Sequence, residues 1–187
     1  VPALAFLVVL GQITLGGWVS SNYAAVACVD LPTCHGEWWP QADFANGFHL
    51  TQHIGPNYLG GQLDSDARTA IHISHRLGAL MVTCVLLLLS WKLHRHGLSS
   101  LARWVLLALA VQVGLGISNV LFHLPLAVAV AHNAGGAALL LCMVLVNYRI
   151  RVVAKAKARR VSHGWRLTPL TRGGVVHYLG DNPWQRF

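Results

Sequence analysis

Charged side chains are scarce in this chain of 187 residues. Only 11% of the residues are charged and 55% are hydrophobic, whereas a soluble domain carries about 25% charged residues. Because the apolar residues also occur in long blocks, we expect an integral membrane protein. The net charge of +8 lies mostly at predicted helix ends and in the C-terminal tail, where membrane topology explains it, so we expect no nucleic-acid partner.

An initiator methionine is also lacking, and the chain opens inside an apolar run, residues 1–18. This run has neither the basic start nor the small-residue cleavage site of a signal peptide. We therefore expect it to be a membrane span, in a sequence that begins inside a longer protein or was trimmed.

Four apolar stretches are each close to the roughly 20 residues that cross about 30 Å of hydrocarbon. They cover about residues 3–19, 71–93, 101–122 and 126–148. Short connections between the last three predict antiparallel neighbours. The expected fold is an all-α integral membrane protein: a four-transmembrane-helix bundle over residues 1–150, with a long loop at 23–70 and a basic tail at 151–187.

Charges of opposite sign gather in different connections. Residues 23–70 hold one basic residue, Arg68, and five of the six acidic residues of the chain. Most basic residues follow the second and fourth spans instead. Since basic segments stay in the cytoplasm, we expect the loop to be extracytoplasmic, in the periplasm if the membrane is a bacterial inner membrane. Both chain ends are then cytoplasmic, and the basic run is an orientation anchor beside the lipid.

The predicted outer loop contains two cysteines, Cys28 and Cys34. An oxidising location makes a disulfide between them plausible. Metal binding and two free thiols remain as alternatives. The spacing is a poor one for zinc, which takes four ligands at other spacings, although His35 could add a ligand.

Ionisable side chains stand at the mouths of two predicted spans: His72, His75 and Arg76 at the second, and His132 at the fourth. Such groups are costly within a membrane unless they have partners or a function. His75 lies about five residues into its span and His132 about seven. At about 1.5 Å per residue, both lie within roughly 6 to 11 Å of the same membrane face.

Two imidazoles at similar depth on parallel helices can bind one haem iron from opposite faces of the porphyrin. Glycines near both histidines leave room for a flat ring, although small residues also serve plain helix packing, and membrane histidines often only bond a neighbouring helix. The chain lacks Cys-x-x-Cys-His, so the expected cofactor is a non-covalent haem b. Arg76 is a candidate partner for a haem propionate, unless it only extends to the interface.

Several motifs, in this order, resemble the haem A synthase family of cytochrome oxidase assembly proteins. They are Gly11-Gln-Ile-Thr-Leu-Gly-Gly-Trp-Val-Ser20, Cys28-x5-Cys34-His-Gly-Glu-Trp-Trp39, His72-Ile-Ser-His-Arg76, Gln112-Val-Gly-Leu-Gly116 and Ala131-His-Asn-Ala-Gly-Gly136. The likeness covers about residues 1–150 and is closest to the C-terminal half of proteobacterial members. It implies that the chain is half of an eight-helix protein built from two four-helix halves in tandem.

The resemblance also implies a function. The C-terminal half would hold haem b between His75 and His132, while the N-terminal half handles the substrate. The reaction oxidises a methyl group of haem O to the formyl group of haem A. Cys28 and Cys34 match a disulfide pair with a redox role, and His72 stands where the substrate half of some members carries a carboxylate, which makes it a candidate for a proton or gating role.

One half alone is not expected to complete haem A synthesis. The implied partners are therefore a separate N-terminal half or a second copy of this chain, and haem O synthase as the supplier of haem O. The alternative function is a non-enzymatic bis-histidine b-type cytochrome that carries electrons in the membrane. A haem-free membrane scaffold is a third hypothesis.

Overall fold

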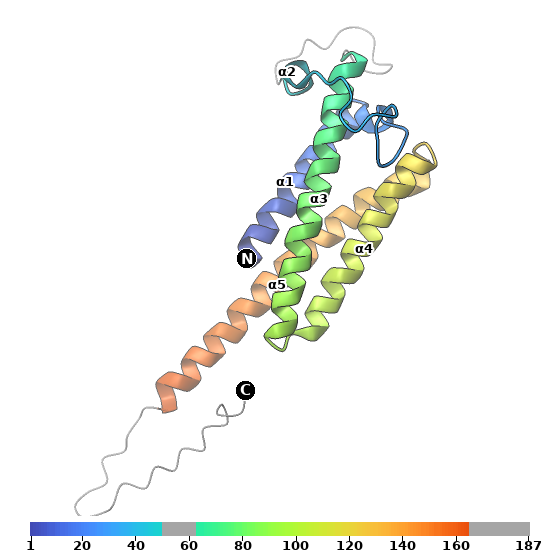
Figure 1. Ribbon diagram of the computed structural model, residues 1–187. Coiled ribbons are helices and arrows are strands. Elements are labelled where there is room, and N and C mark those ends of the chain that lie inside the picture. Colours follow the sequence, from blue (N-terminus) through green and yellow to red (C-terminus); the bar gives the residue numbers. More distant parts are fainter. Residues whose placement is uncertain (50–62, 165–187) are drawn as a thin grey trace, which may run out of the picture. The chain divides into compact units, whose positions relative to one another are not determined.

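The described part of the chain is helical. The computed structural model describes residues 1–49 and 63–164. Its helices are α1 (Pro2–Ser21), the short 3-10 helix η1 (Ala24–Val26), α2 (Phe44–Gly47), α3 (Ser65–Arg95), α4 (Ser99–Leu121) and α5 (Leu126–Gly164) (Figure 1). Within these two ranges there is no strand, only an isolated bridge between Cys34 and Glu37.

Four of the helices are long and apolar enough to cross a membrane. The candidate spans are Pro2–Ser21, Ser65–Arg95, Ser99–Leu121 and Leu126–Ala156. The predicted all-α membrane fold with four spans is thereby confirmed. That the chain is half of an eight-helix tandem stays a prediction.

Two spans are longer than their apolar stretches predict. α3 begins at Ser65 because Asp64 caps it, its carboxylate accepting a hydrogen bond of 2.9 Å from the Ala67 N–H. Basic residues in the last turn of α3 stabilise its C-terminal end, because positive charge interacts favourably with the helix dipole there. α5 runs on to Gly164, so the start of the predicted tail is helical. The rest of the tail and residues 50–62 lie outside the described residues.

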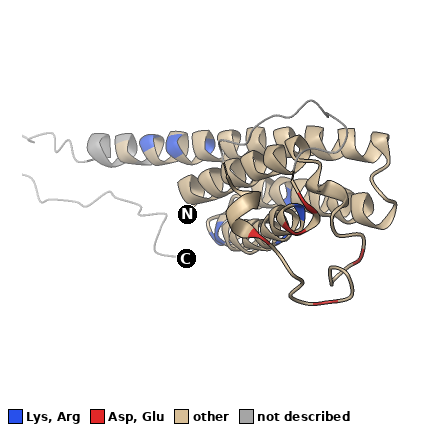
Figure 2. Ribbon diagram, turned by 90° about the horizontal axis from the view of Figure 1, so that it is seen from above, with Lys and Arg blue, Asp and Glu red and all other residues tan. Residues whose placement is uncertain are grey.

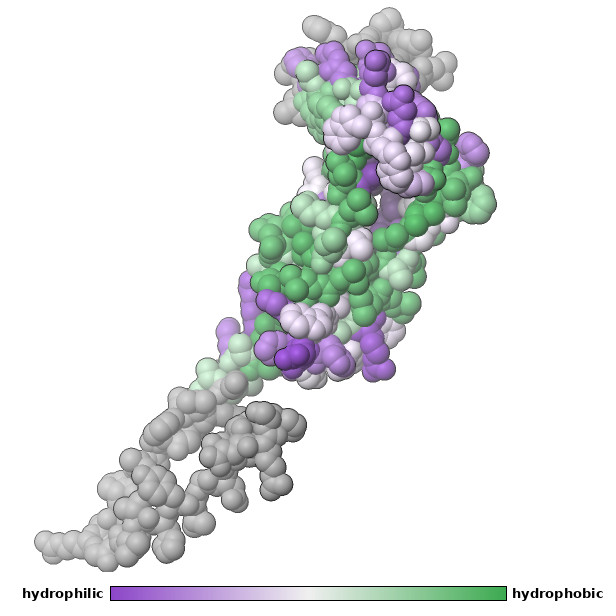
Figure 3. All heavy atoms as spheres, viewed as in Figure 1, coloured by the Kyte–Doolittle hydropathy of each residue, from purple (hydrophilic) through white to green (hydrophobic). Residues whose placement is uncertain are grey.

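The chain divides into two units, residues 1–150 and residues 151–187, and the candidate site lies wholly in the first. Large apolar side chains are exposed on all four long helices, among them Leu7, Leu80, Trp104 and Leu141. Figure 3 shows these hydrophobic surfaces along the middle of the helices, with hydrophilic residues gathered at both ends of the hydrophobic zone. All acidic side chains of the described residues lie between positions 23 and 70 (Figure 2).

The buried core occupies the half of the bundle far from the loop that connects α1 to α3. It is built from Ala5 and Val9 of α1, residues 82–93 of α3, residues 102–109 of α4 and residues 139–146 of α5. A smaller cluster of Val19, Ala24 and Ile71 lies at the loop end. Between these clusters, glycines and polar side chains replace large apolar residues where the four helices pass the level of the two histidines.

Candidate functional site

His75 on α3 faces a glutamine and a glycine on α1. Gln12 Nε2 donates to the His75 main-chain carbonyl over 2.9 Å. The same amide nitrogen lies 3.1 Å from His75 Nδ1 and 3.5 Å from Nε2. The ring rests on Gly16, where a Cβ would stand 3.2 Å from His75 Cε1, and Gln12 Oε1 lies against Gly78. The imidazole is therefore held through its backbone and given room by glycine.

His132 on α5 has the same surroundings on α4. Gln112 Nε2 donates to the His132 main-chain carbonyl over 3.0 Å. The ring rests on Gly116, where a Cβ would stand 3.1 Å from His132 Cε1, and Gln112 Oε1 lies against Gly135. Two buried atoms here, His132 Nδ1 and Gln112 Oε1, have no hydrogen-bond partner among the described residues.

The two helix pairs thus share one arrangement of glutamine, glycine and histidine. They differ at the ring, because Gln12 lies within hydrogen-bond distance of the His75 imidazole, whereas His132 Nδ1 has no partner among the described residues. The sequence Gln-x-x-Leu-Gly begins at Gln12 on α1 and again at Gln112 on α4, and His-x-x-Gly begins at His75 and at His132. The motifs quoted above contain both glutamines, but their part in the site is visible only in the contacts. The repeated Gln-x-x-Leu-Gly was the signal that could have revealed it.

His72 has a different partner. Its Nδ1 lies 2.9 Å from the main-chain oxygen of Ala24 in η1, and the residue is only 5% exposed. His72 therefore links the start of α3 to η1, the short helix that follows α1. It does not share the glutamine–glycine surroundings of His75. Its predicted proton or gating role stays a prediction.

Arg76 binds the loop that connects α1 to α3. Its Nη1 donates to the Thr33 carbonyl over 2.8 Å, and its Nη2 donates to the carbonyls of Asp30 and Cys28 over 2.9 and 3.2 Å. Only Nε is buried without a partner within the described ranges. The guanidinium thus ties the cysteine-containing segment to α3, next to His75. Its predicted contact with a haem propionate stays a prediction.

The cysteine segment forms a compact ring. The sulfur atoms of Cys28 and Cys34 are 2.06 Å apart, and the two residues are 1% and 3% exposed. Across the ring, the Asp30 carboxylate accepts from the Thr33 hydroxyl over 2.5 Å and from the N–H groups of His35 and Gly36 over 2.8 and 3.0 Å. These hydrogen bonds, led by the one from Thr33, lower the pKa of Asp30 to about 2.

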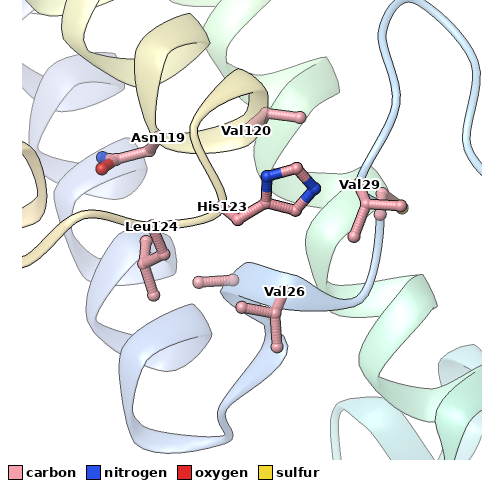
Figure 4. A pocket seen from close by; sticks show the side chains of 8 residues that line it. Val26, Val29, Asn119, Val120, His123 and Leu124 are labelled. Carbon is pink, nitrogen blue, oxygen red and sulfur yellow. The ribbon is translucent and has the colours of Figure 1, made fainter.

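A small pocket separates this ring from the α4–α5 turn (Figure 4). Its walls include Val26, Cys28 and Val29 on one side and Asn119, His123 and Leu124 on the other. Its volume of about 50 Å³ admits a few waters but no porphyrin. We therefore give it no part in binding a large ligand.

The side chains do not form a metal site by themselves. In residues 1–49 and 63–164, no group of three or more His, Cys, Asp or Glu side chains could hold a metal ion. The histidine pair could hold a metal only if a bound group supplied the other ligands. The fold and site together define a membrane-spanning helical protein with a matched pair of histidines.

Comparison with known proteins gives the family. The family model described as "Cytochrome oxidase assembly protein" matches residues 1–144. The chain therefore belongs to the family of cytochrome oxidase assembly proteins that includes the haem A synthases, which confirms the resemblance seen in the motifs.

Curated relatives agree with this family. A protein named Heme A synthase from Shewanella oneidensis is 47% identical over 146 residues, which are 78% of this chain and 44% of that protein. A Heme A synthase from Nitrosospira multiformis is 31% identical over 153 residues, which are 80% of this chain and 39% of that protein. The chain thus spans less than half the length of these relatives. No solved structure matches it.

Proposed function

We propose that this chain is the C-terminal, haem b-binding half of a haem A synthase, the enzyme that oxidises the methyl group of haem O to the formyl group of haem A. The observation that carries the proposal is the matched environment of His75 and His132 on two copies of one helix pair. The proposal is supported by relatives that bear the name Heme A synthase and are more than twice as long as the matching segment.

The residues present fit a haem held by two imidazoles. A haem iron takes four ligands from its porphyrin and needs at most two from the protein, which is what a lone pair of histidines can supply. The buried Nδ1 of His132, which has no partner in the described ranges, is suited to a site completed by a bound group. Gly16 and Gly116 let the two imidazoles lie directly against the backbone of a neighbouring helix, which fixes where each ring sits.

Within this proposal each residue has a task. Haem b, when bound, supplies one-electron redox chemistry. His75 and His132 hold its iron, and Gln12 lies at the His75 ring, where an outer partner orients a ligand imidazole. The exposed apolar side chains of the four helices face lipid and keep bulk water from the site.

The location and partners follow from the same reasoning. We place the protein in a bacterial inner membrane, with loop 23–70 in the periplasm and both ends in the cytoplasm; the uneven distribution of charge supports this orientation. In the oxidising periplasm, Cys28 and Cys34 form a disulfide. An N-terminal four-helix half, or a second copy of this chain, would bind the haem O substrate, which haem O synthase would supply.

Haem extraction after co-expression tests the activity. The chain is produced together with haem O synthase and an N-terminal four-helix half, and the extracted haems are separated. We expect haem A from this combination and only haem O when His132→Ala replaces the native chain. A b-type spectrum without any haem A would instead identify the chain as a plain bis-histidine cytochrome.

A further inference from the structure

The two glutamines are the polar side chains that join the helices at the level of the histidines. We infer that Gln12 and Gln112 are positioning residues, each of which fixes one ligand histidine of the haem b site. The inference rests on the proposed function, because it assumes that the two imidazoles share one iron.

Each amide bonds the histidine that it positions, and not a neighbour. The amide nitrogen donates to the main-chain oxygen of His75 or His132. The amide oxygen lies against the glycine three residues further on, at a place where any Cβ would collide with it. The contacts of one glutamine side chain thus fix both the position along its axis and the rotation of the helix that carries the histidine.

The ring position follows from that contact. On α1 the glycine under the imidazole, Gly16, stands four residues after Gln12, and on α4 Gly116 stands four residues after Gln112. Residues four apart lie on the same helix face. Once the amide is bonded to the histidine carbonyl, the ring therefore meets the glycine one turn away.

Helix packing alone is a weak reason for these amides. Hydrogen bonds between transmembrane helices stabilise only weakly on average, and a buried polar atom that lacks a partner among the described residues, such as Gln112 Oε1, carries a cost. A leucine would fill the space without that cost. The demands of ligation are stricter, since ligand side chains must be held within about 0.5 Å, whereas a slip of one residue moves a helix by about 1.5 Å.

Four variants and two controls test the inference in the purified full chain. Gln12→Leu and Gln112→Leu remove the amides. Gly78→Ala and Gly135→Ala displace them, at small cost to the fold because the obstructing atom ends a flexible side chain. Gly17→Ala and Gly114→Ala are the matched controls, since a Cβ at either position meets no atom of the described residues within 4 Å.

Haem retention and the electron paramagnetic resonance of the ferric protein are measured, because the largest g value depends on the angle between the two imidazole planes. We expect each of the four variants to bind haem b about tenfold more weakly, as for other outer partners of metal ligands, and to shift that g value. The controls should match the native protein. If the glutamines had only a structural role, the four variants would have a lower unfolding temperature and an unchanged g value.

The outcomes separate the two proposals. If both leucine variants and both alanine variants keep native haem retention and g values while His75→Ala loses haem, ligation stands and the positioning role is wrong. If the native chain binds no haem b, the proposed function is wrong and the positioning role falls with it. If a leucine variant does not fold, the glycine variants decide.

Discussion

The imidazole of His75 lies directly on the backbone of Gly16, with Cε1 only 3.2 Å from the place that a Cβ would occupy. His132 and Gly116 repeat this relationship at 3.1 Å. Glycine at these two positions is therefore required by the place of each ring, and not by the path of the helix.

Replacement of Gly16 by valine should abolish haem binding. The three carbon atoms of the added isopropyl group overpack the site beneath the ring, at a cost of about 1–3 kcal/mol, and the imidazole can relieve this only by leaving its position. Gly17→Val is the control, because a Cβ there has open space around it. The b-type absorbance per chain is the measurement; equal absorbance in the two variants would show that the Gly16 contact does not matter.

Arg76 should protect the cysteine ring from reduction. Its guanidinium holds three carbonyls of that ring, and a hydrogen bond from a charged group stabilises by about 1.5–3 kcal/mol. In Arg76→Leu we expect the Cys28–Cys34 pair to be reduced about tenfold faster, as about 1.4 kcal/mol of lost protection implies. The rate is read from thiol alkylation after addition of a reductant. Haem loss with an unchanged reduction rate would point to the propionate contact instead.

Loss of the His72 side chain should weaken the loop end and spare the haem site. The change His72→Ala removes one hydrogen bond to the Ala24 carbonyl and opens a space in a buried position, at a cost of at least about 1 kcal/mol. We expect a lower unfolding temperature with an unchanged b-type spectrum. A native unfolding temperature combined with lost haem A formation would argue for the proton or gating role.

The cysteine ring should lose stability only in strong acid. The pKa of Asp30 is lowered from 3.8 to about 2. A carboxyl with a lowered folded-state pKa stabilises the folded state fully above its ordinary pKa and loses that contribution as the pH falls through the folded value. In the native protein, pepsin cleavage within residues 28–37 should therefore increase as the pH is lowered from 4 to 2. In Asp30→Asn, cleavage of the same segment should depend little on pH. A native protein that is cleaved equally at both pH values would contradict this.

The membrane spans could be predicted because they depend on distances along one helix. The bilayer sets the length of a span, and the apolar stretches of the sequence have that length. The extension of α3 to Ser65 was also foreseeable, since Asp64 is a favoured capping residue.

Contacts between helices could not be predicted in the same way. Arg76 stands at a helix mouth, and hydropathy cannot tell that the chain from Cys28 to Thr33 returns to its guanidinium. His72 and His75 are three residues apart and equally polar, yet one bonds η1 and the other faces α1. The partners of these side chains depend on how helices and loops pack in three dimensions, which periodicity along the chain does not encode.

The reduced-minus-oxidised absorbance spectrum of the purified chain tests the central claim most directly. The native protein should show a low-spin b-type spectrum, and His75→Ala and His132→Ala should each lose it, because each removes one of the two ligands of the iron. Full retention of that spectrum in both variants would contradict the account.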